Sequence, residues 1–375
     1  MTLPGLDSLL ATAATEASKW DSGTGVPRDV IDEAARIGLL GLDVPAEYGG
    51  AGAGDGEVGR VAAELGAVCG SLRALLTVSG MVNAAVRRWG NAGQRERWLP
   101  RLASGAALAA FAATEEGAGT DLGAVVTRIE PRDGGFRVTG RKIWVTFGQD
   151  AEVLLVLGRA PGGPATVLVP TDAPGVRREP VRDALGLRGA RLAHVTLDDV
   201  PVEAGEVIGP AGFGLTHTVG TALDHGRHTV AWGCVGMARG SLAEAARHVA
   251  RRRQGGTALS GHTTVRAALG RLQARTEGAA ALCERAAELR ESKDPGAISA
   301  TITAKYAAAT AAAAVSRDAV QLLGSAGCGG TSRVARFFRD AKIMQIIEGT
   351  DEISELAIGD RVLAAHTPSA GDAPR

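Results

Sequence analysis

The pattern of hydrophobic positions divides the chain into a helical part, a part made of short strands, and a second helical part. Over the first 110 positions, apolar residues recur at the spacing of helix faces. In the segment PRDVIDEAARIGLLGLDVP the residues that share one such face are Val30, Ile31, Ala34 and Ile37. Glycines end the pattern at positions 38 and 41. Residues 1–111 are therefore predicted to form an N-terminal helical domain.

The pattern changes near residue 112. Short Val-rich runs follow, separated by Gly, Pro and Asp: GGFRVTGRKIWVTF, AEVLLVLGR, ATVLVPT and RLAHVTLDDVPV. Such runs are typical of β-strands joined by tight turns. Residues 112–210 are predicted to form a central small domain built on an antiparallel β-sheet or a small barrel.

Helical spacing returns after residue 210. Residues 221–253 form one long helical stretch, and TTVRAALGRLQARTEGAAALCERAAELRE and AISATITAKYAAATAAAAVSRDAVQLLG form two more, separated by SKDPG. A final helix is predicted to carry MQIIEGTDEIS. Four helices indicate a C-terminal four-helix bundle over 211–365, with a disordered tail at 366–375. The predicted fold class is a multidomain α+β protein.

Composition excludes several classes of function. The 41 basic and 41 acidic residues cancel, so no basic excess points to nucleic acid or to an anionic membrane surface. No apolar run approaches the roughly 20 residues of a membrane span, and we see no secretory signal at the N-terminus. The four cysteines lack CxxC spacing and nearby paired histidines, which predicts free thiols, no metal site and a cytoplasmic location.

Glu348 stands where an apolar run stops abruptly, in MQIIEGTDEIS. A solvated glutamate needs no such setting, whereas a base that removes a weakly acidic proton does, because desolvation raises the basicity of a carboxylate. The alternative is a helix-capping or surface glutamate.

Three further segments carry candidate chemistry: FAATEEGAGTD (111–121), GRKIWVTFG (140–148) and LDHGRHTVAWGCVGMARGSLAEAARHVARRRQGG (223–256). Read alone, the first is a generic turn, and a strand tryptophan such as Trp144 is more often core. Taken in order with the last segment, AVQLLGSAGCGGTSRVARFFRDAKIMQIIEGTDEIS, they resemble the flavin-dependent acyl-CoA dehydrogenase family. The resemblance covers roughly residues 20–365.

The resemblance implies FAD as cofactor. It implies that the flavin lies along the first two segments and is contacted by Thr114, Gly119, Thr120, Trp144 and Thr146. Backbone N–H groups next to small residues suit a phosphate. Three positions depart from the family pattern: Glu116 stands where Pro is usual, Thr120 where Ser is usual, and Phe147 where Asn is usual. Thr120 keeps the hydroxyl group.

The resemblance also implies sites shared between subunits, and hence a homodimer or homotetramer. Arg252 matches an arginine that reaches the pyrophosphate of a neighbouring subunit's flavin, a contact for which Arg is well suited. The residues expected at the same partner flavin are Gln321, Gly324 and Ser325. Gly255 and Thr263 depart from the family at the adenine end.

In the last segment, Glu348 matches the catalytic base, with Thr350 and Glu352 flanking the cofactor. Arg227 matches an arginine near that base. The implied reaction removes the α-proton of a thioester while a hydride leaves the β-carbon for the flavin, and hydrogen bonds stabilise the developing enolate.

Some stretches, GSLRALLTVSGM, GNAGQR, HGRHTVAWGCVG and RDAKIMQIIEG, most resemble the branch that makes hydroxymalonyl or methoxymalonyl polyketide extender units on an acyl carrier protein. We therefore expect a short polar acyl thioester on a carrier protein, with the electron acceptor unknown. The alternatives are an ordinary acyl-CoA dehydrogenase of fatty-acid or amino-acid breakdown, a flavin monooxygenase of the same fold, which would not need Glu348, and a non-catalytic helical scaffold.

Overall fold

The computed structural model describes residues 3–210 and 212–366. Its N-terminal part is helical, as predicted. The helices are α1 Leu6–Ser22, α2 Arg28–Arg36, α3 Asp55–Gly66, α4 Gly70–Trp89 and α5 Ala92–Ala103. Local signals set their starts: Asn91 and Gln94 form a capping box at α5, and the Cys69 thiol accepts a hydrogen bond from the Leu72 N–H at α4.

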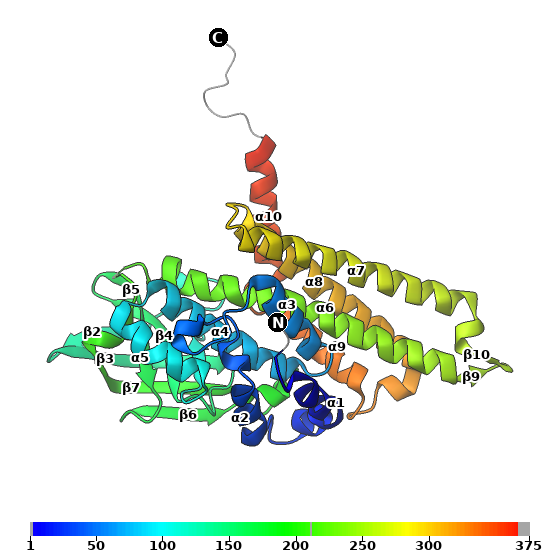
Figure 1. Ribbon diagram of the computed structural model, residues 1–375, viewed down its shortest axis with the longest axis horizontal. Helices are drawn as coiled ribbons and strands as arrows, with labels where there is room; N and C mark the ends of the chain where they lie inside the picture. Colours follow the sequence, from blue (N-terminus) through cyan, green and yellow to red (C-terminus); the bar gives the residue numbers. More distant parts are fainter. Residues whose placement is uncertain (1–2, 211, 367–375) are drawn as a thin grey trace, which may run out of the picture.

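A sheet follows, at one end of the molecule (Figure 1). Its strands are β1 Ala109–Ala112, β2 Arg128–Arg132, β3 Gly135–Val145, β4 Val153–Ala160, β5 Gly163–Pro170, β6 Val176–Pro180, β7 Ala193–Glu203 and β8 Val207–Ile208. Hydrogen bonding orders them β6-β7-β3-β2-β4-β5-β8, with β1 added beside β4. The predicted runs match β3, β4, β5 and β7, while the shorter strands carried too weak a pattern to be found.

The sheet is mixed. Most neighbours are antiparallel, but β1 and β2 each pair with β4 in parallel. The pairing of β1 with β4 needs a long crossover, and here the chain passes through 113–127, β2 and β3 before it returns as β4. The start of the segment 113–121 lies beside β3, since the Ile143 N–H donates to the Thr114 carbonyl oxygen, and this matters for the site.

The C-terminal part consists of α6 Gly220–Arg251, α7 Thr263–Glu291, α8 Ala297–Leu323, α9 Arg333–Met344 and α10 Asp351–His366, with the short strands β9 Arg253–Gln254 and β10 Thr257–Ala258 between α6 and α7. The prediction of a single final helix is wrong, because the structure has two helices there, α9 and α10. The helical run is broken between them, because Glu348 and Gly349 take φ values of 58° and 98°, which a right-handed helix excludes.

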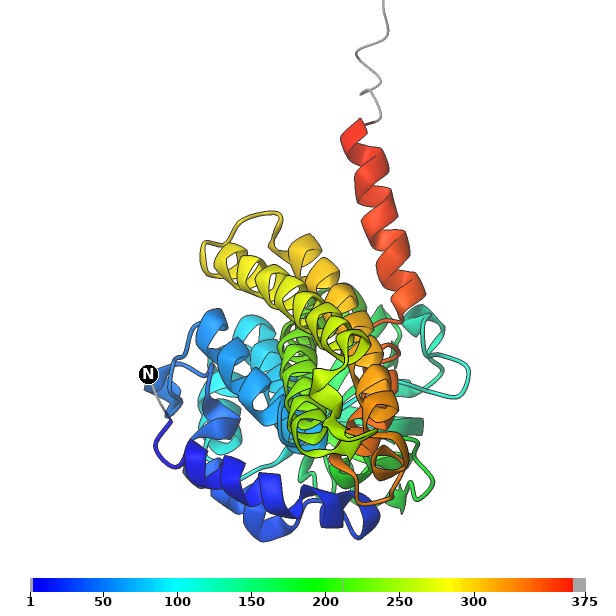
Figure 2. The same ribbon diagram turned by 90° about the vertical axis from the view of Figure 1, so that its right-hand side faces the viewer.

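Helix α10 stands away from the body of the molecule (Figures 1 and 2). It carries exposed apolar side chains, among them Leu356 and Val362. His366, predicted to begin the disordered tail, is instead the last residue of α10. The rest of that predicted tail, 367–375, lies outside the described residues.

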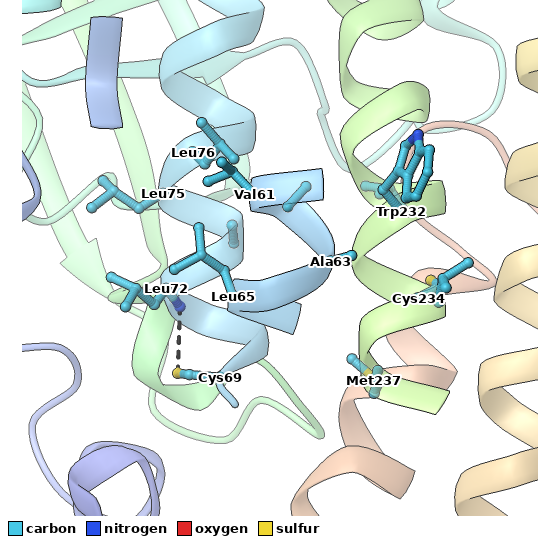
Figure 3. Close-up of a cluster of buried hydrophobic side chains, with 14 of the residues drawn as sticks. Val61, Ala63, Leu65, Cys69, Leu72, Leu75, Leu76, Trp232, Cys234 and Met237 are labelled. Carbon is cyan, nitrogen blue, oxygen red and sulfur yellow. Dashed lines mark hydrogen bonds between the residues drawn. The ribbon is translucent and has the colours of Figure 1, made fainter. Parts of the chain in front are cut away.

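The main core joins α3 and α4 to α6 (Figure 3). Small residues bring these backbones together: a Cβ at Gly236 would lie 1.9 Å from the Ala63 carbonyl oxygen, and one at Gly66 would lie 2.2 Å from the Gly233 carbonyl oxygen. The N-terminal helices and the bundle therefore form one continuous core. The boundaries predicted at residues 111, 210 and 365 stay predictions.

Candidate active site

Glu348 lies in the turn between α9 and α10, in a backbone conformation that favours glycine. Two cations hold this turn. The Arg227 Nε on α6 donates to the Glu348 carbonyl oxygen at 2.9 Å, and the Lys305 Nζ on α8 donates to the Gly349 carbonyl oxygen at 2.6 Å. Lys305 is fully buried. The position of Glu348 is thus fixed through its backbone, and its carboxylate is left available.

The Glu348 carboxylate lies on α6. A Cβ built at Gly226 would come within 2.7 Å of the Glu348 Cδ and 2.8 Å of its Oε2. Although Glu348 as a whole is partly exposed, Oε2 is buried and has no hydrogen-bond partner among the described residues. A buried acceptor without a partner is uncommon in folded proteins and calls for an explanation, of which a catalytic role is one.

Burial raises the pKa of Glu348 to about 7, against the opposing pull of the positive charges of Arg227, Lys305 and Arg73. A carboxyl group with this pKa is half ionised near neutrality, which suits a general base. Burial also lowers the pKa of Lys305, because a buried ammonium loses its hydration.

The first two sequence motifs are tied together by a buried ion pair. Lys142 Nζ on β3 lies 2.7 Å from the Glu115 Oε1 and donates to the Ala113 carbonyl oxygen at 3.0 Å. Glu115 also accepts the N–H groups of Val126, at 2.7 Å, and of Thr127, at 3.1 Å. These charged residues have a structural role that sequence reasoning missed: they fix the loop after β1 against β3.

Trp144 is half exposed and has a φ of 57°. Its backbone N–H donates to the His194 Nδ1 at 3.3 Å. Its indole ring meets the His194 imidazole edge-on, with 5.6 Å between the ring centroids. The alternative interpretation of Trp144 as a core residue is therefore wrong. Phe147, which replaces the family's Asn, is the buried one; it takes a φ of 54°, and its N–H donates to the Ala190 carbonyl oxygen at 2.8 Å.

The surface beside Trp144 fits a flavin. The Ile143 N–H donates to the Thr114 carbonyl oxygen at 2.9 Å, so the loop that carries Gly119 and Thr120 lies next to the strand that carries Trp144. Gly119 and Thr120 are exposed, Thr114 and Thr146 are partly exposed, and a Cβ at Gly119 would meet nothing within 4 Å. Here a flat exposed indole, hydroxyl groups and an open backbone can meet an aromatic ring and a phosphate.

A second group of predicted residues lies at the other end of α6. Arg252 lines a cleft of about 400 Å³ together with Glu244, Arg247, His248, Arg251 and Leu323. The exposed residues Gln321, Gly324 and Ser325 flank Leu323 at the end of α8. Between Arg227 and Arg251, α6 rises about 36 Å at 1.5 Å per residue. The structure therefore does not bring Arg252 and its neighbours to Glu348.

The residues after Glu348 open α10. The Thr350 Oγ1 accepts the Ile353 N–H at 3.4 Å, and Glu352 is exposed. Gln345 joins the two sides of the turn, because its Nε2 donates to the Asp351 Oδ2 at 2.7 Å. Gly255, with a φ of 58°, and Thr263, the first residue of α7, are both exposed near the far end of α6.

Three family models match the chain in order: the N-terminal domain of acyl-CoA dehydrogenase over residues 8–106, the middle domain over 110–200 and the C-terminal domain over 212–363. Short-chain specific acyl-CoA dehydrogenase from mitochondria of Mus musculus is 30% identical over 346 residues, which is 91% of this chain and 84% of that protein.

Solved structures share the fold. FkbI, for biosynthesis of the methoxymalonyl extender unit of the Fk520 polyketide, has a TM-score of 0.90 and 39% identity, covering 96% of this chain and 99% of FkbI. A glutaryl-CoA dehydrogenase from Mycobacterium smegmatis in complex with FADH2 has a TM-score of 0.89 and 25% identity, covering 96% and 95% of the two chains.

The motif order, the fold and the full-length similarity agree with one another. The predicted three-part architecture, the use of FAD and oxidoreductase chemistry on a CH–CH bond are confirmed. This chain belongs to the acyl-CoA dehydrogenase family.

Proposed function

We propose that this chain is an acyl-thioester dehydrogenase in which Glu348 is the general base. One observation carries the proposal: the Glu348 Oε2 is buried without a partner, in a turn whose backbone is held by Arg227 and Lys305. An ordinary capping or surface glutamate would have its oxygens in water or hydrogen-bonded. The burial that raises the pKa of Glu348 to about 7 prepares the carboxylate to take a proton.

In the proposed step, Glu348 removes the proton on the α-carbon of the thioester as a hydride departs from the β-carbon. The proton goes to the Glu348 carboxylate, the Cα–H and Cβ–H bonds break, and a Cα=Cβ double bond forms. FAD, when bound, supplies the hydride acceptor. Arg227 acts by holding the Glu348 carbonyl, so the carboxylate keeps one orientation toward the substrate.

We propose Thr114, Gly119, Thr120, Trp144 and Thr146 as the flavin contacts within one subunit, with Thr350 and Glu352 at the edge of the cofactor. Arg252, Gln321, Gly324 and Ser325 would meet the flavin of a second subunit. The length of α6 supports this division, because Arg252 directly follows Arg251, which lies about 36 Å from Arg227 along the helix. The exposed apolar residues of α10 also suit a homodimer or homotetramer.

For the substrate we propose a short polar acyl group on the phosphopantetheine arm of an acyl carrier protein. The 39% identity to FkbI over nearly the whole chain supports this choice. An ordinary acyl-CoA dehydrogenase is the alternative, and the similarity to short-chain acyl-CoA dehydrogenase favours it. Glu348 weighs against a flavin monooxygenase, which would not need it.

No helix in the described part of the chain is long and apolar enough to cross a membrane. A cytoplasmic location remains our prediction, supported by the four free cysteines.

The test is anaerobic mixing of the FAD-loaded protein with acyl thioesters, followed by the absorbance of the flavin. Bleaching by a thioester, lost in Glu348→Gln, is the expected result. A protein that takes up no FAD, or whose flavin no thioester reduces, would overturn the proposal. The variant Trp144→Ala is expected to fold, because the side chain is half exposed, and to hold FAD more weakly.

A further inference from the structure

The strand that carries Trp144 is interrupted by a bulge where it pairs with β7. The register of β3 against β7 shifts after Lys142 and before Val145, so two residues of β3 face the single residue His194 of β7. A bulge leaves the extra residue outside the ladder and re-aims its side chain. Here Lys142 and Val145 both stay buried, while the indole of Trp144 turns outward to the surface proposed for the flavin.

The two N–H groups in the bulge donate to acceptors outside the ladder of β3 and β7. The Ile143 N–H donates to the Thr114 carbonyl oxygen at 2.9 Å, and the Trp144 N–H donates to the His194 Nδ1 at 3.3 Å. The first acceptor is a backbone carbonyl, which any residue at position 114 provides. The second acceptor is a side chain, so the bond to Trp144 depends on which residue stands at position 194.

The backbone of Trp144 is strained. Its φ of 57° lies in the left-handed region, which a residue with a side chain adopts at a cost in energy and keeps only where its surroundings hold it. Phe147, with a φ of 54°, is held by the burial of its ring and by the bond from its N–H to the Ala190 carbonyl oxygen. Because the Trp144 side chain is half exposed, packing contributes less there, and the bond to His194 contributes more.

The His194 ring also touches the indole. The two rings meet edge-on, with 87° between their planes and 5.6 Å between their centroids, which is a favourable arrangement of aromatic rings. Because Nδ1 accepts a hydrogen bond, it carries no proton, and the neutral imidazole has its proton on Nε2.

An ordinary polar residue of the sheet is the alternative role for His194. Glu179 of β6 lies directly across from it, but the Glu179 Oε2 accepts from the Arg141 Nη2 at 3.0 Å. Among the residues that the structure describes, the hydrogen bond and the ring contact of the His194 imidazole both go to Trp144. The arrangement therefore favours a role that His194 performs through Trp144.

We propose that His194 is a positioning residue for the flavin site: its Nδ1 accepts the Trp144 N–H and so holds the left-handed backbone that turns the indole toward the flavin ring. This inference rests on the proposed function, in which Trp144 contacts the flavin. The face of an indole is rich in electrons, and reduction adds electrons to the flavin. An indole held against the ring therefore disfavours the reduced form, and His194 helps to set the reduction potential.

The test uses the FAD-loaded protein and separates the two contacts of His194. His194→Phe keeps an aromatic ring and removes the acceptor, whereas His194→Asn keeps an acceptor near the position of Nδ1 and removes the ring. Release of FAD on dilution gives the affinity, and equilibration with a redox dye gives the potential.

His194→Phe is expected to bind FAD about 3–10-fold more weakly, the usual effect of one hydrogen bond, and to have a higher reduction potential. His194→Asn is expected to stay close to wild type in both measurements. An Asn variant that is changed as much as the Phe variant would overturn the inference.

Trp144→Ala shows whether His194 acts through the indole. Its reduction potential is expected to shift in the same direction as that of His194→Phe. The double variant is expected to match Trp144→Ala alone, because His194 has no indole to position once Trp144 is replaced. Shifts that add up in the double variant would show that His194 acts on the flavin by another route, and would contradict the inference.

His217→Phe is the matched control, because it makes the same exchange beside another tryptophan. His217 lies in the short helix Gly214–Val219 before α6, with 4.5 Å between its ring centroid and that of Trp89. Its Nδ1 is bonded to the Thr216 hydroxyl group and not to a backbone N–H. Equal changes in His217→Phe and His194→Phe would count against the inference. Should His194→Phe not fold, His194→Leu takes its place, since it also lacks the acceptor.

The same variants separate the inference from the proposed function. If Trp144→Ala changes the affinity for FAD and the potential but His194→Phe changes neither, the inference fails and the flavin contact of Trp144 stands. If Trp144→Ala changes neither, the proposed flavin contact itself fails, and the inference fails with it. If the variants behave as expected but no thioester reduces the wild-type flavin, the dehydrogenase function fails and the role of His194 stands.

Discussion

The carboxylate of Glu348 lies so close to Gly226 that a Cβ at position 226 would come within 2.7 Å of the Glu348 Cδ. The two residues are 122 positions apart, on α6 and in the turn before α10. Arg227, the next residue on α6, holds the Glu348 backbone carbonyl. One turn of α6 therefore positions Glu348 in two ways. Arg227 holds its backbone carbonyl, and the missing side chain at Gly226 leaves room for its carboxylate.

Gly226→Ala is expected to slow flavin reduction by about 100-fold, because the added methyl displaces the carboxylate and a shift near 1 Å can cost that much. Stopped-flow absorbance measures the rate. Gly278→Ala on α7 is the control, since a Cβ there meets nothing within 4 Å. Equal rates for both variants would mean that the Glu348 side chain can move away from position 226 without slowing flavin reduction.

Glu348→Gln is expected to keep the fold and the bound FAD while slowing reduction of the flavin by roughly 10²–10⁴-fold. Glutamine preserves the size of the side chain and removes the base. Glu284→Gln, at an exposed position of α7, serves as the control. A rate within a few-fold of wild type would assign the base to another residue, and Glu352 would be examined first.

The rate of flavin reduction is expected to rise with pH and level off above about 7, since the pKa of Glu348 is about 7 and only the ionised carboxylate accepts a proton. Stability has the opposite dependence. The folded pKa lies above the ordinary value of 4.5, so protons stabilise the native state, and this contribution is lost as pH rises through the folded pKa.

Thermal unfolding of wild type and Glu348→Gln from pH 5 to pH 8 checks the sign of this linkage. The variant has no carboxylate to ionise, so it is expected to gain stability relative to wild type across this range. A difference in stability between the two proteins that stays constant with pH would show that folding does not change the pKa of Glu348.

Lys142→Met is expected to destabilise the fold by about 3–5 kcal/mol, because it leaves the buried Glu115 without its cation. Denaturant unfolding gives the free energy. The double variant Lys142→Met, Glu115→Gln is expected to recover part of the loss. Additive losses in the double variant would argue against a direct interaction between the two side chains.

The same acyl group is expected to reduce the flavin faster when it is carried by an acyl carrier protein than when it is carried by CoA. A carrier protein adds its own docking surface to the shared pantetheine arm, whereas CoA adds a nucleotide. Rates are compared at equal concentrations of the two thioesters. Efficient reduction by long-chain or branched acyl-CoA, with none by carrier-protein thioesters, would favour the ordinary acyl-CoA dehydrogenase.

Local pattern was enough to predict the order of the parts and several helix ends. The start of α7 at Thr263 and the break between α7 and α8 at SKDPG follow from side-chain periodicity and from Pro and Gly, which act within a few residues. The resemblance to a known family likewise pointed to Glu348 as the base. These signals are contained in short stretches of the chain.

The geometry of the site was decided by contacts between distant segments. The apolar run before Glu348 reads as continuous helix, and its left-handed turn forms with Arg227 and Lys305 bonded to the carbonyls around it. Arg73 falls within an ordinary helical pattern, and only the packing of α4 on α6 buries it, since a Cβ at Gly233 of α6 would lie 2.7 Å from the Arg73 Cδ. Side-chain periodicity tells which face of a helix is buried, but the partners of a buried charge depend on how the helices pack.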